Sequence, residues 1–387
     1  MPYTDNFLFN FLNVFNMKLT KLLLTTLSAF ALTACAGTAS NQSTANRQPQ
    51  PDTHKVATNT ATTDIPESAG LSADFENRTL SANKDIFIQE VAERYKVPLN
   101  HVANLINSAQ VNSQTQRLMA PSTNGRVKRS WTTYRSRVID PVRVRGGQNF
   151  MQRNATTLSQ VEQQYGVPKE IISSIIGVET VYGNYMGNFR LLDSLYTLGF
   201  HHPDPSRPER HQSFRNQLAA LIKLDHQGKL NANTELGSFA GATGLPQFMP
   251  ISIMHFAVDG DGDGRIDLRN SEIDAIHSVA NFLVKHGWQR GMPVFAPASL
   301  PKNPAAVEGK GLEPTLTWQE LQAQGSSSNA ANVSWKNGRT LGVINLMDET
   351  HGRNEYRIAT QNFFAITKYN NSYFYAASVA DFAQTLK

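Results

Sequence analysis

The stretch Val167–Gly183 reads V-P-K-E-I-I-S-S-I-I-G-V-E-T-V-Y-G and predicts a buried helix. Pro168 suits the first turn of a helix, where a missing N–H costs nothing. Three isoleucines then follow at helical spacing and would share one apolar face: Ile172, Ile175 and Ile176. Glu179 continues the same series, so the pattern places a carboxylate on the face that the helix buries.

Burial would make Glu179 a candidate general acid. Removing a carboxyl group from water disfavours its charged form and raises its pKa. A carboxylic acid that is still protonated near neutral pH is what general-acid cleavage of a glycosidic bond requires. The alternative is a structural glutamate at a helix end, paired with a buried arginine or capping a backbone group, because structural networks also bury carboxylates.

The composition indicates a folded protein with a mild positive charge. The chain has 387 residues, of which 40% are hydrophobic, and a formal net charge of +5. This length fits one large domain or two smaller ones, and the apolar content allows a sizeable core. The charge favours an anionic partner but does not specify nucleic acid.

The first residues have the features of an export signal. Met17–Lys21 is a basic segment, and Leu22–Leu32 is an apolar segment too short for a comfortable membrane span. Leu32-Thr33-Ala34-Cys35 then resembles a bacterial lipobox, in which the peptide is cut before the cysteine and the cysteine is lipidated. Cys35 is the only cysteine, so an intrachain disulfide is impossible. The alternative is an ordinary secretory signal with an incidental cysteine.

The expected signal peptide covers residues 1–34, with Met17 as the expected start, because residues 1–16 precede a complete signal. No aspartate follows at the second mature position, which by resemblance to such signals points to the outer membrane of a Gram-negative cell, facing the periplasm. Residues 35–82 are rich in Thr, Ser, Ala, Asn and Gln and predict a disordered tether behind the lipidated Cys35.

Ordered structure is expected over residues 83–387, and most of it is expected to be helical. Two short helices broken at Val97-Pro98 are followed by helices near residues 152–166, 168–179, 193–198, 212–225, 274–286 and 362–387. Tyr95-Lys96-Val97-Pro98 is echoed by Tyr165-Gly166-Val167-Pro168, which indicates a repeated helix-turn device. Residues 292–355 contain Pro, Gly and short alternating runs and predict a small β-containing insertion.

Basic and aromatic residues alternate between Arg126 and Arg145. Trp131 and Tyr134 lie among seven basic residues: Arg126, Lys128, Arg129, Arg135, Arg137, Arg143 and Arg145. Such clusters can bind single-stranded nucleic acid, but they suit a polyanionic glycan equally, because aromatic faces stack on sugars as they do on bases. The expected periplasmic address argues against nucleic acid. The alternative is a solvated charged face.

Residues 237–250 read G-S-F-A-G-A-T-G-L-P-Q-F-M-P and form an unusual loop. Its small residues permit close backbone approach and uncommon dihedral angles. Ser238 and Gln247 could present polar groups to a ligand. The stretch is neither a phosphate loop nor a dinucleotide motif.

The run D-G-D-G-D-G-R-I-D at residues 259–267 predicts a calcium loop. Its carboxylates at loop positions 1, 3 and 5, glycine at 6 and apolar residue at 8 match the start of an EF-hand. Asn270 stands at position 12, where a bidentate glutamate is expected, so Glu272 or Asp274 would have to close the site. The alternative is a solvated acidic turn, and no His/Cys cluster indicates zinc.

Four motifs occur in order: Gly177-Val178-Glu179-Thr180, the 237–250 loop, the acidic loop followed by Asp274-Ala275-Ile276, and Tyr369-Asn370-Asn371-Ser372. Together they resemble the membrane-bound lytic murein transglycosylase B family over about residues 83–387. The resemblance implies a mainly α, lysozyme-like helical core with an N-terminal helical part, an EF-hand-like calcium loop and a small inserted β domain.

The resemblance also implies an activity. Family members cleave the β-1,4 bond between N-acetylmuramic acid and N-acetylglucosamine in peptidoglycan without adding water, and leave a 1,6-anhydromuramic end. Glu179 would be the single acid/base. The expected partners are peptidoglycan glycan strands, together with the outer membrane through Cys35 and cell-wall synthesis enzymes as candidates, with no nucleic acid.

The resemblance also implies substrate-binding and metal-binding positions in this sequence. The implied substrate-binding residues are Tyr134, Ser238, Gln247, Phe248, Phe282, Tyr369, Asn370 and Tyr375. Phe282 stands where the family often has tyrosine, so a hydrogen bond through that hydroxyl would be missing. The implied ligands of a structural Ca²⁺ are Asp259, Asp261, Asp263, the backbone oxygen of Arg265 and Asp274. No organic cofactor is implied.

Two other functions stay open at this point. A non-catalytic peptidoglycan-binding lipoprotein would recruit other wall enzymes, but it has no need of a buried acid at Glu179. A hydrolytic muramidase would need a second carboxylate facing Glu179. Asp193 is a candidate for that carboxylate, but no motif supports it.

Overall fold

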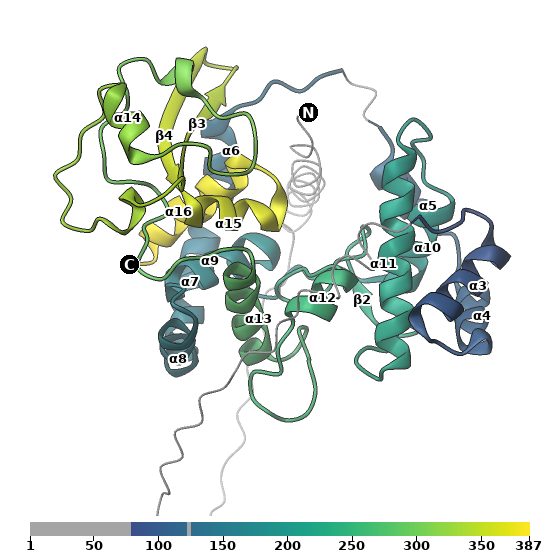
Figure 1. The fold of residues 1–387 in the computed structure, drawn as a ribbon. Coiled ribbons are helices and arrows are strands. Elements are labelled where there is room, and N and C mark those ends of the chain that lie inside the picture. The colour runs from purple at the N-terminus through teal and green to yellow at the C-terminus, as the bar shows by residue number, and fades with distance from the viewer. Residues whose placement is uncertain (1–78, 122–124) are drawn as a thin grey trace, which may run out of the picture. The chain divides into compact units, whose positions relative to one another are not determined.

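The computed structural model describes residues 79–121 and 125–387 (Figure 1). The expected signal peptide, Cys35 and nearly all of the expected tether lie outside these residues. The described part is mainly helical, with two small antiparallel sheets, which confirms the expected mainly α class. Within these ranges, every helix falls short of the length or apolar content that spanning a bilayer requires.

A first group of helices packs together through apolar side chains. Its members are α3 (Lys84–Tyr95), α4 (Leu99–Ser108), α5 (Ser113–Met119), α10 (Leu191–Phe200), α11 (Pro208–His226) and α12 (Pro250–Phe256). Phe87, Leu195 and Leu221 are fully buried in the hydrophobic core of this group. The short strands β1 (Phe189–Arg190) and β2 (Leu236–Gly237) pair antiparallel beside α10.

A second group of helices surrounds α9 (Lys169–Thr180). The helices that contact it are α7 (Pro141–Arg153), α8 (Ala155–Tyr165), α13 (Glu272–Lys285) and α16 (Tyr373–Thr385), while α6 (Trp131–Val138) and α15 (Gln361–Asn370) pack on α16. Nearly all of α9 is buried, because apolar and small side chains face its neighbours on every side. Figure 1 shows α7, α8 and α13 beside it.

The echoed Tyr-x-Val-Pro sequences form the same turn twice, as predicted. Lys96 and Gly166 both adopt the left-handed conformation, with φ of 55° and 70°, at the C-terminal ends of α3 and α8. Val97 and Val167 are buried, and each following proline caps the next helix. The device therefore turns the chain sharply between two packed helices, including the turn that leads into α9.

Two predicted helices are each divided in the structure. The region 152–166 lies in α7 and α8, which meet at Asn154, where the backbone φ of −106° interrupts the helix. The region 362–387 forms α15 and α16. Ser372 begins the second of these helices by accepting a hydrogen bond from the N–H of Tyr375, so a side-chain cap competes with helix continuation.

A β-hairpin follows α13. Strands β3 (Leu341–Asp348) and β4 (Arg353–Thr360) pair antiparallel, with Leu341 opposite Thr360. Trp318, Trp335 and Ile358 belong to a separate hydrophobic cluster under this hairpin, together with α14 (Trp318–Ala323) and the 3₁₀ turns η1 (Pro304–Val307) and η2 (Ser334–Lys336). The expected insertion limit at residue 355 falls inside β4, because the strand pairing continues to Thr360.

Candidate active site

Glu179 lies in the last turn of α9, where it is partly buried. Its Oε1 accepts a hydrogen bond of 2.6 Å from the hydroxyl of Tyr375 on α16. Burial raises the pKa of the Glu179 carboxyl from its ordinary value to about 7, although the hydrogen bond from Tyr375 acts in the opposite direction. The group can therefore be protonated and ionised at similar pH, as an acid that later acts as a base must be.

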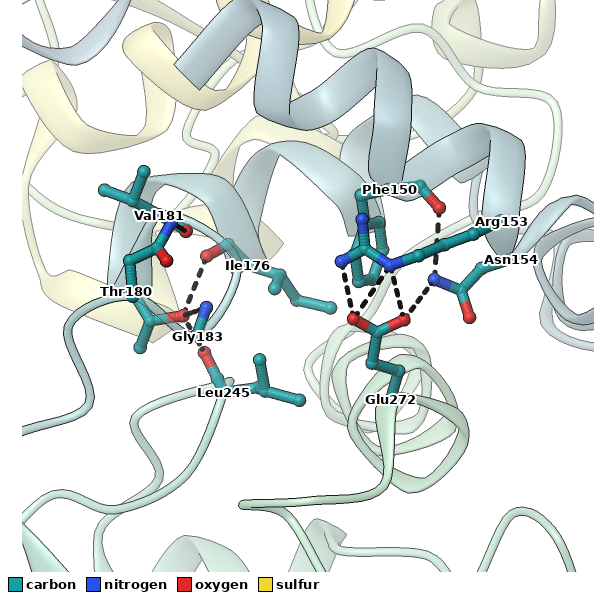
Figure 2. Close-up of polar contacts among 10 residues, drawn as sticks. Phe150, Arg153, Asn154, Ile176, Thr180, Val181, Gly183, Leu245 and Glu272 are labelled. Carbon is teal, nitrogen blue, oxygen red and sulfur yellow. Dashed lines mark hydrogen bonds and ion pairs between the residues drawn. The ribbon is translucent and has the colours of Figure 1, made fainter. Parts of the chain in front are cut away.

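The residue after Glu179 joins the helix to the 237–250 loop (Figure 2). The hydroxyl oxygen of Thr180 lies 3.1 Å from the carbonyl oxygen of Leu245 and 3.2 Å from that of Ile176, and it accepts the N–H of Gly183 at 3.1 Å. Thr180 thus holds the end of α9, the following turn and the loop together. Sequence reasoning missed this role, although a hydroxyl residue directly after the candidate acid was visible.

The turn after α9 has an unusual backbone. Val181 and Tyr182 are both in the left-handed region, with φ of 51° and 57°. This conformation is disfavoured for side chains that carry a Cβ, so the surrounding packing must hold it. Tyr182 lies against α7 and α9 at glycines: a Cβ added to Gly147 or Gly177 would meet its hydroxyl oxygen at 2.5 Å or 2.4 Å.

The 237–250 loop is held from a second side. The hydroxyl of Tyr369 donates to the carbonyl of Pro246 at 2.7 Å. Gln247 has a left-handed φ of 49°, and its side-chain amide donates to the carbonyl of Gly244 at 2.9 Å. Ser238 is buried, and its hydroxyl accepts the N–H of Ala242 at 3.1 Å. Ser238 and Gln247 are therefore ordered parts of the loop, with side chains that support its backbone.

The structure brings most of the predicted aromatic residues together beside Glu179. The rings of Phe248 and Phe282 lie 5.6 Å apart, and that of Phe282 lies 4.8 Å from Tyr369. Tyr369 and Tyr375 are stacked at 6.1 Å with 14° between their planes. Phe248 and Phe282 are only 2% and 5% exposed, so they back this cluster more than they face solvent.

The remaining two predicted substrate-binding residues, Tyr134 and Asn370, lie at the edges of this aromatic cluster. Tyr134 is buried on α6, and its ring is 5.6 Å from that of Phe374. Asn370 is partly buried at the last position of α15, directly after Tyr369. The predicted set thus converges from α6, α9, the 237–250 loop, α13, α15 and α16.

Three predicted metal ligands also converge. Asp259, Asp261 and Asp263 each contribute one carboxylate oxygen to a group whose members all lie within 4.8 Å of one another. Asp274 stands behind them: it is 1% exposed, and its two oxygens accept the N–H groups of Gly260 at 2.8 Å and Asp267 at 2.7 Å. Asp274 is not a member of the converging group, but it fixes the backbone of the loop.

A neighbouring ion pair joins α7 to the helix that follows the acidic loop. Glu272, at the start of α13, binds Nε of Arg153 at 3.0 Å and Nη2 at 2.5 Å, and it accepts a hydrogen bond of 2.6 Å from Asn154 (Figure 2). Glu272 is one of the two carboxylates that the sequence offers for closing the calcium loop. Its carboxylate is instead engaged by Arg153 and Asn154.

Several arginines of the 126–145 cluster are paired internally. The pairs are Arg126 with Glu349, Arg135 with Asp381, and Arg143 with Asp140. In addition, the indole N–H of Trp131 donates to Glu355 at 3.0 Å. These contacts tie α6 and α7 to their surroundings and reduce the positive charge that the three paired arginines can offer to a glycan.

Comparison with known proteins identifies the family of this chain. The family model described as Transglycosylase SLT domain matches residues 80–384. Membrane-bound lytic murein transglycosylase B of Escherichia coli (strain K12) is 32% identical over 325 residues, and the match covers 82% of this chain and 85% of that protein. The matched region contains every predicted catalytic, substrate-binding and metal-binding residue.

Solved structures of two relatives have the same fold. Lytic transglycosylase SltB1 from Pseudomonas aeruginosa superimposes with a TM-score of 0.69 at 33% identity, over 79% of this chain and 97% of that chain. Lytic transglycosylase Slt35 from Escherichia coli, solved in complex with calcium, gives a TM-score of 0.64 at 32% identity, over 78% and 91%. The chain therefore belongs to the membrane-bound lytic murein transglycosylase B family and is a peptidoglycan lytic transglycosylase.

Proposed function

We propose that this lytic transglycosylase cuts the β-1,4 bond between N-acetylmuramic acid and N-acetylglucosamine and leaves a 1,6-anhydromuramic end, with Glu179 as its single acid/base. The observation that carries the proposal is the partly buried Glu179, which accepts a hydrogen bond from Tyr375 and whose burial raises the pKa of its carboxyl to about 7. SltB3 from Pseudomonas aeruginosa, a relative with 28% identity and a TM-score of 0.64 over 79% of this chain and 80% of that one, was solved with NAG-anhNAM-pentapeptide.

In the proposed reaction Glu179 handles one proton twice. The protonated carboxyl first gives its proton to the glycosidic oxygen as the bond from that oxygen to C1 of the muramic residue breaks. The resulting carboxylate then takes the proton of the C6 hydroxyl, whose oxygen bonds to C1. The C6 oxygen replaces water as the nucleophile, so Glu179 ends the cycle protonated again.

The surroundings of Glu179 support one carboxylate rather than two. Hydrolytic glycosidases usually place a second carboxylate across the bond that is cut. Among the described residues, no other acid contributes to the pKa shift of Glu179. Asp193 on α10 is the candidate for the second carboxylate of a muramidase. Its carboxylate accepts the N–H of Gln110 at 2.9 Å and pairs with Arg190 at 3.2 Å, so it has a structural role.

The first prediction concerns Glu179→Gln. The amide cannot donate a proton to the leaving oxygen, so we expect cleavage to fall by at least about a thousandfold while glycan binding persists. Mass spectrometry of peptidoglycan digests measures the loss of anhydro ends. Glu170→Gln, on the same helix, is the control and should cleave normally. Cleavage by Glu179→Gln within tenfold of the unsubstituted protein would exclude Glu179 as the acid.

The same variant should also change stability with pH. The raised pKa of Glu179 means that the folded state holds its proton above the ordinary value of 4.5. Stability from this group is therefore present at low pH and is lost as the pH rises towards about 7. Glu179→Gln removes that loss, so its melting temperature at pH 8 should equal or exceed that of the unsubstituted protein.

The second prediction concerns the hydroxyl of Tyr375. Its hydrogen bond favours ionised Glu179, so Tyr375→Phe should raise the pKa of Glu179 further. Because the first step needs the protonated acid, kcat/KM should fall above that pKa, and the variant should move this alkaline limb to higher pH. Tyr373→Phe, on the same helix but bonded to Gly311 instead, is the control. An unmoved limb would show that Tyr375 does not tune the acid.

We propose that the acidic loop binds a structural Ca²⁺. Slt35 was solved in complex with calcium, and three carboxylates of this chain already converge on one point. Oxygen ligands of this kind fit Ca²⁺. Asp259, Asp261, Asp263 and the backbone carbonyl of Arg265 would hold the ion. Asp274 would close the site with an oxygen that also accepts a backbone N–H of the loop. The ion would neutralise the clustered charge and fix the loop, and it takes no part in the proton transfers.

The third prediction tests the ion. Chelation should lower the melting temperature by roughly a few degrees, and added Ca²⁺ should restore it, because a ligand that binds only the folded state stabilises that state. Calorimetry with and without chelator measures this change. Asp261→Asn should abolish the response. Identical melting curves for the unsubstituted protein in both conditions would contradict the proposed Ca²⁺ site.

We further propose that the catalytic region, residues 83–387, is anchored to the outer membrane through lipidated Cys35 and a tether over residues 35–82. The support is the lipobox-like sequence before Cys35 and the membrane-bound relative in Escherichia coli. A tethered enzyme could reach peptidoglycan from the membrane surface, where wall-synthesis enzymes are candidate partners.

The fourth prediction tests the anchor. The full chain expressed in a Gram-negative host should sediment with outer membranes, and Cys35→Ser should release it or leave it uncleaved, because serine offers no thiol for the lipid. Membrane fractionation and intact-mass measurement report the two states. An unlipidated Cys35 in the mature protein would contradict the anchor without affecting the proposed chemistry.

A further inference from the structure

A surface pocket between α7 and the turn after α9 has no part in the proton transfers proposed above. Its volume is about 390 Å³, and its polar lining consists of Arg145, Asn149, Arg153, Tyr182 and Asn184. None of the described residues that line it is acidic. A pocket of this size can accept a small ligand or the end of a peptide, and its arginines indicate that the ligand is an anion.

One wall of the pocket is held rigidly. Glu272 binds Nε and Nη2 of Arg153, and the guanidinium carbon lies 5.0 Å from the ring centroid of Phe150 (Figure 2). Nη1 of Arg153 makes no hydrogen bond with any described residue. Arg153 therefore presents a fixed donor to the pocket, although Glu272 offsets much of its charge.

Arg145 provides the uncompensated charge. It is exposed on α7, and within residues 79–121 and 125–387 no hydrogen bond or ion pair engages it. Its neighbours differ in this respect, because Arg135 and Arg143 each pair with an aspartate. A guanidinium group offers two parallel N–H donors that match the two oxygens of a carboxylate.

The pocket is also close to the proposed acid along the chain. Val181 and Tyr182, which line it, follow Glu179 by two and three residues. A ligand bound there would contact the turn that ends α9. Peptidoglycan carries its free carboxylates on the short stem peptides attached to muramic acid, the sugar whose C1 is attacked in the proposed reaction.

We propose that this pocket binds a stem-peptide carboxylate, with Arg145 as its ion-pair partner, and that the enzyme consequently prefers peptide-bearing strands to bare glycan. The proposal rests on the function proposed above. Arg145 is a specificity residue in this scheme, and it does not touch the bond that is cut.

The test compares three substrates with the full chain in detergent. They are strands that carry stem peptides, the same strands with the stem carboxyls converted to amides, and strands from which an amidase has removed the peptides. The rate of formation of anhydro ends gives kcat and KM for each. The variant is Arg145→Gln, and Arg117→Gln, an exposed arginine on α5 without an ion pair, is the charge-matched control. Melting temperatures verify that both variants are folded.

We expect the unsubstituted protein and Arg117→Gln to use peptide-bearing strands with a KM about tenfold lower than for the other two substrates. Arg145→Gln should lose this advantage and cleave all three substrates as the unsubstituted protein cleaves bare strands. An unchanged preference in Arg145→Gln, no preference in the unsubstituted protein, or an equal loss on bare and peptide-bearing strands would overturn the proposal. Failure of the proposed function is distinguishable, because the unsubstituted protein would then form no anhydro ends from any substrate.

Discussion

The rest of the site depends on the hydrogen bond between Tyr375 and Glu179. A carboxyl group in the last turn of a helix buried on every side would favour its protonated form strongly, and a well-solvated one would stay ionised at neutral pH. Burial on α9 and one hydroxyl donor act in opposite directions and leave the pKa near 7. The helices that pack around α9 include α16, which carries Tyr375, so this packing sets the distance between Tyr375 and Glu179.

The loop beside the acid is positioned by the same helices. Hydroxyl groups of Thr180 and Tyr369 contact consecutive carbonyls, those of Leu245 and Pro246. These contacts come from α9 and α15, so the loop is attached to both sides of the site. The left-handed backbone at Gln247 and at Val181 is tolerated because these contacts fix the backbone on either side. Rigidity of this kind would hold the proposed proton donor and the substrate in the reactive arrangement before the reaction begins.

Local patterns in the sequence predicted many of the helices and much of the candidate site. Most of the features that they did not predict depend on contacts between residues far apart in the sequence. Helical periodicity found α9 and its acid, the Tyr-x-Val-Pro echo predicted two identical turns, and the acidic repeat predicted three converging carboxylates. The helix breaks at Asn154 and Ser372 were not predicted, because one depends on the backbone conformation of a single residue and the other on a single side-chain cap. The ion pairs of the arginines near residue 130 could not be predicted, because their acceptors, Glu349 and Asp381, lie more than 200 residues further along the chain. Periodicity carries no information about such pairs.

The separation between Glu179 and Tyr375 is 196 residues, and this distance has a consequence for biogenesis. Synthesis from the N-terminus makes Glu179 long before Tyr375 and Tyr369. Until α15 and α16 pack against the earlier helices, the chain lacks the hydrogen bond to Glu179 and one of the two attachments of the 237–250 loop. The complete site therefore depends on the last helices of the chain to be made.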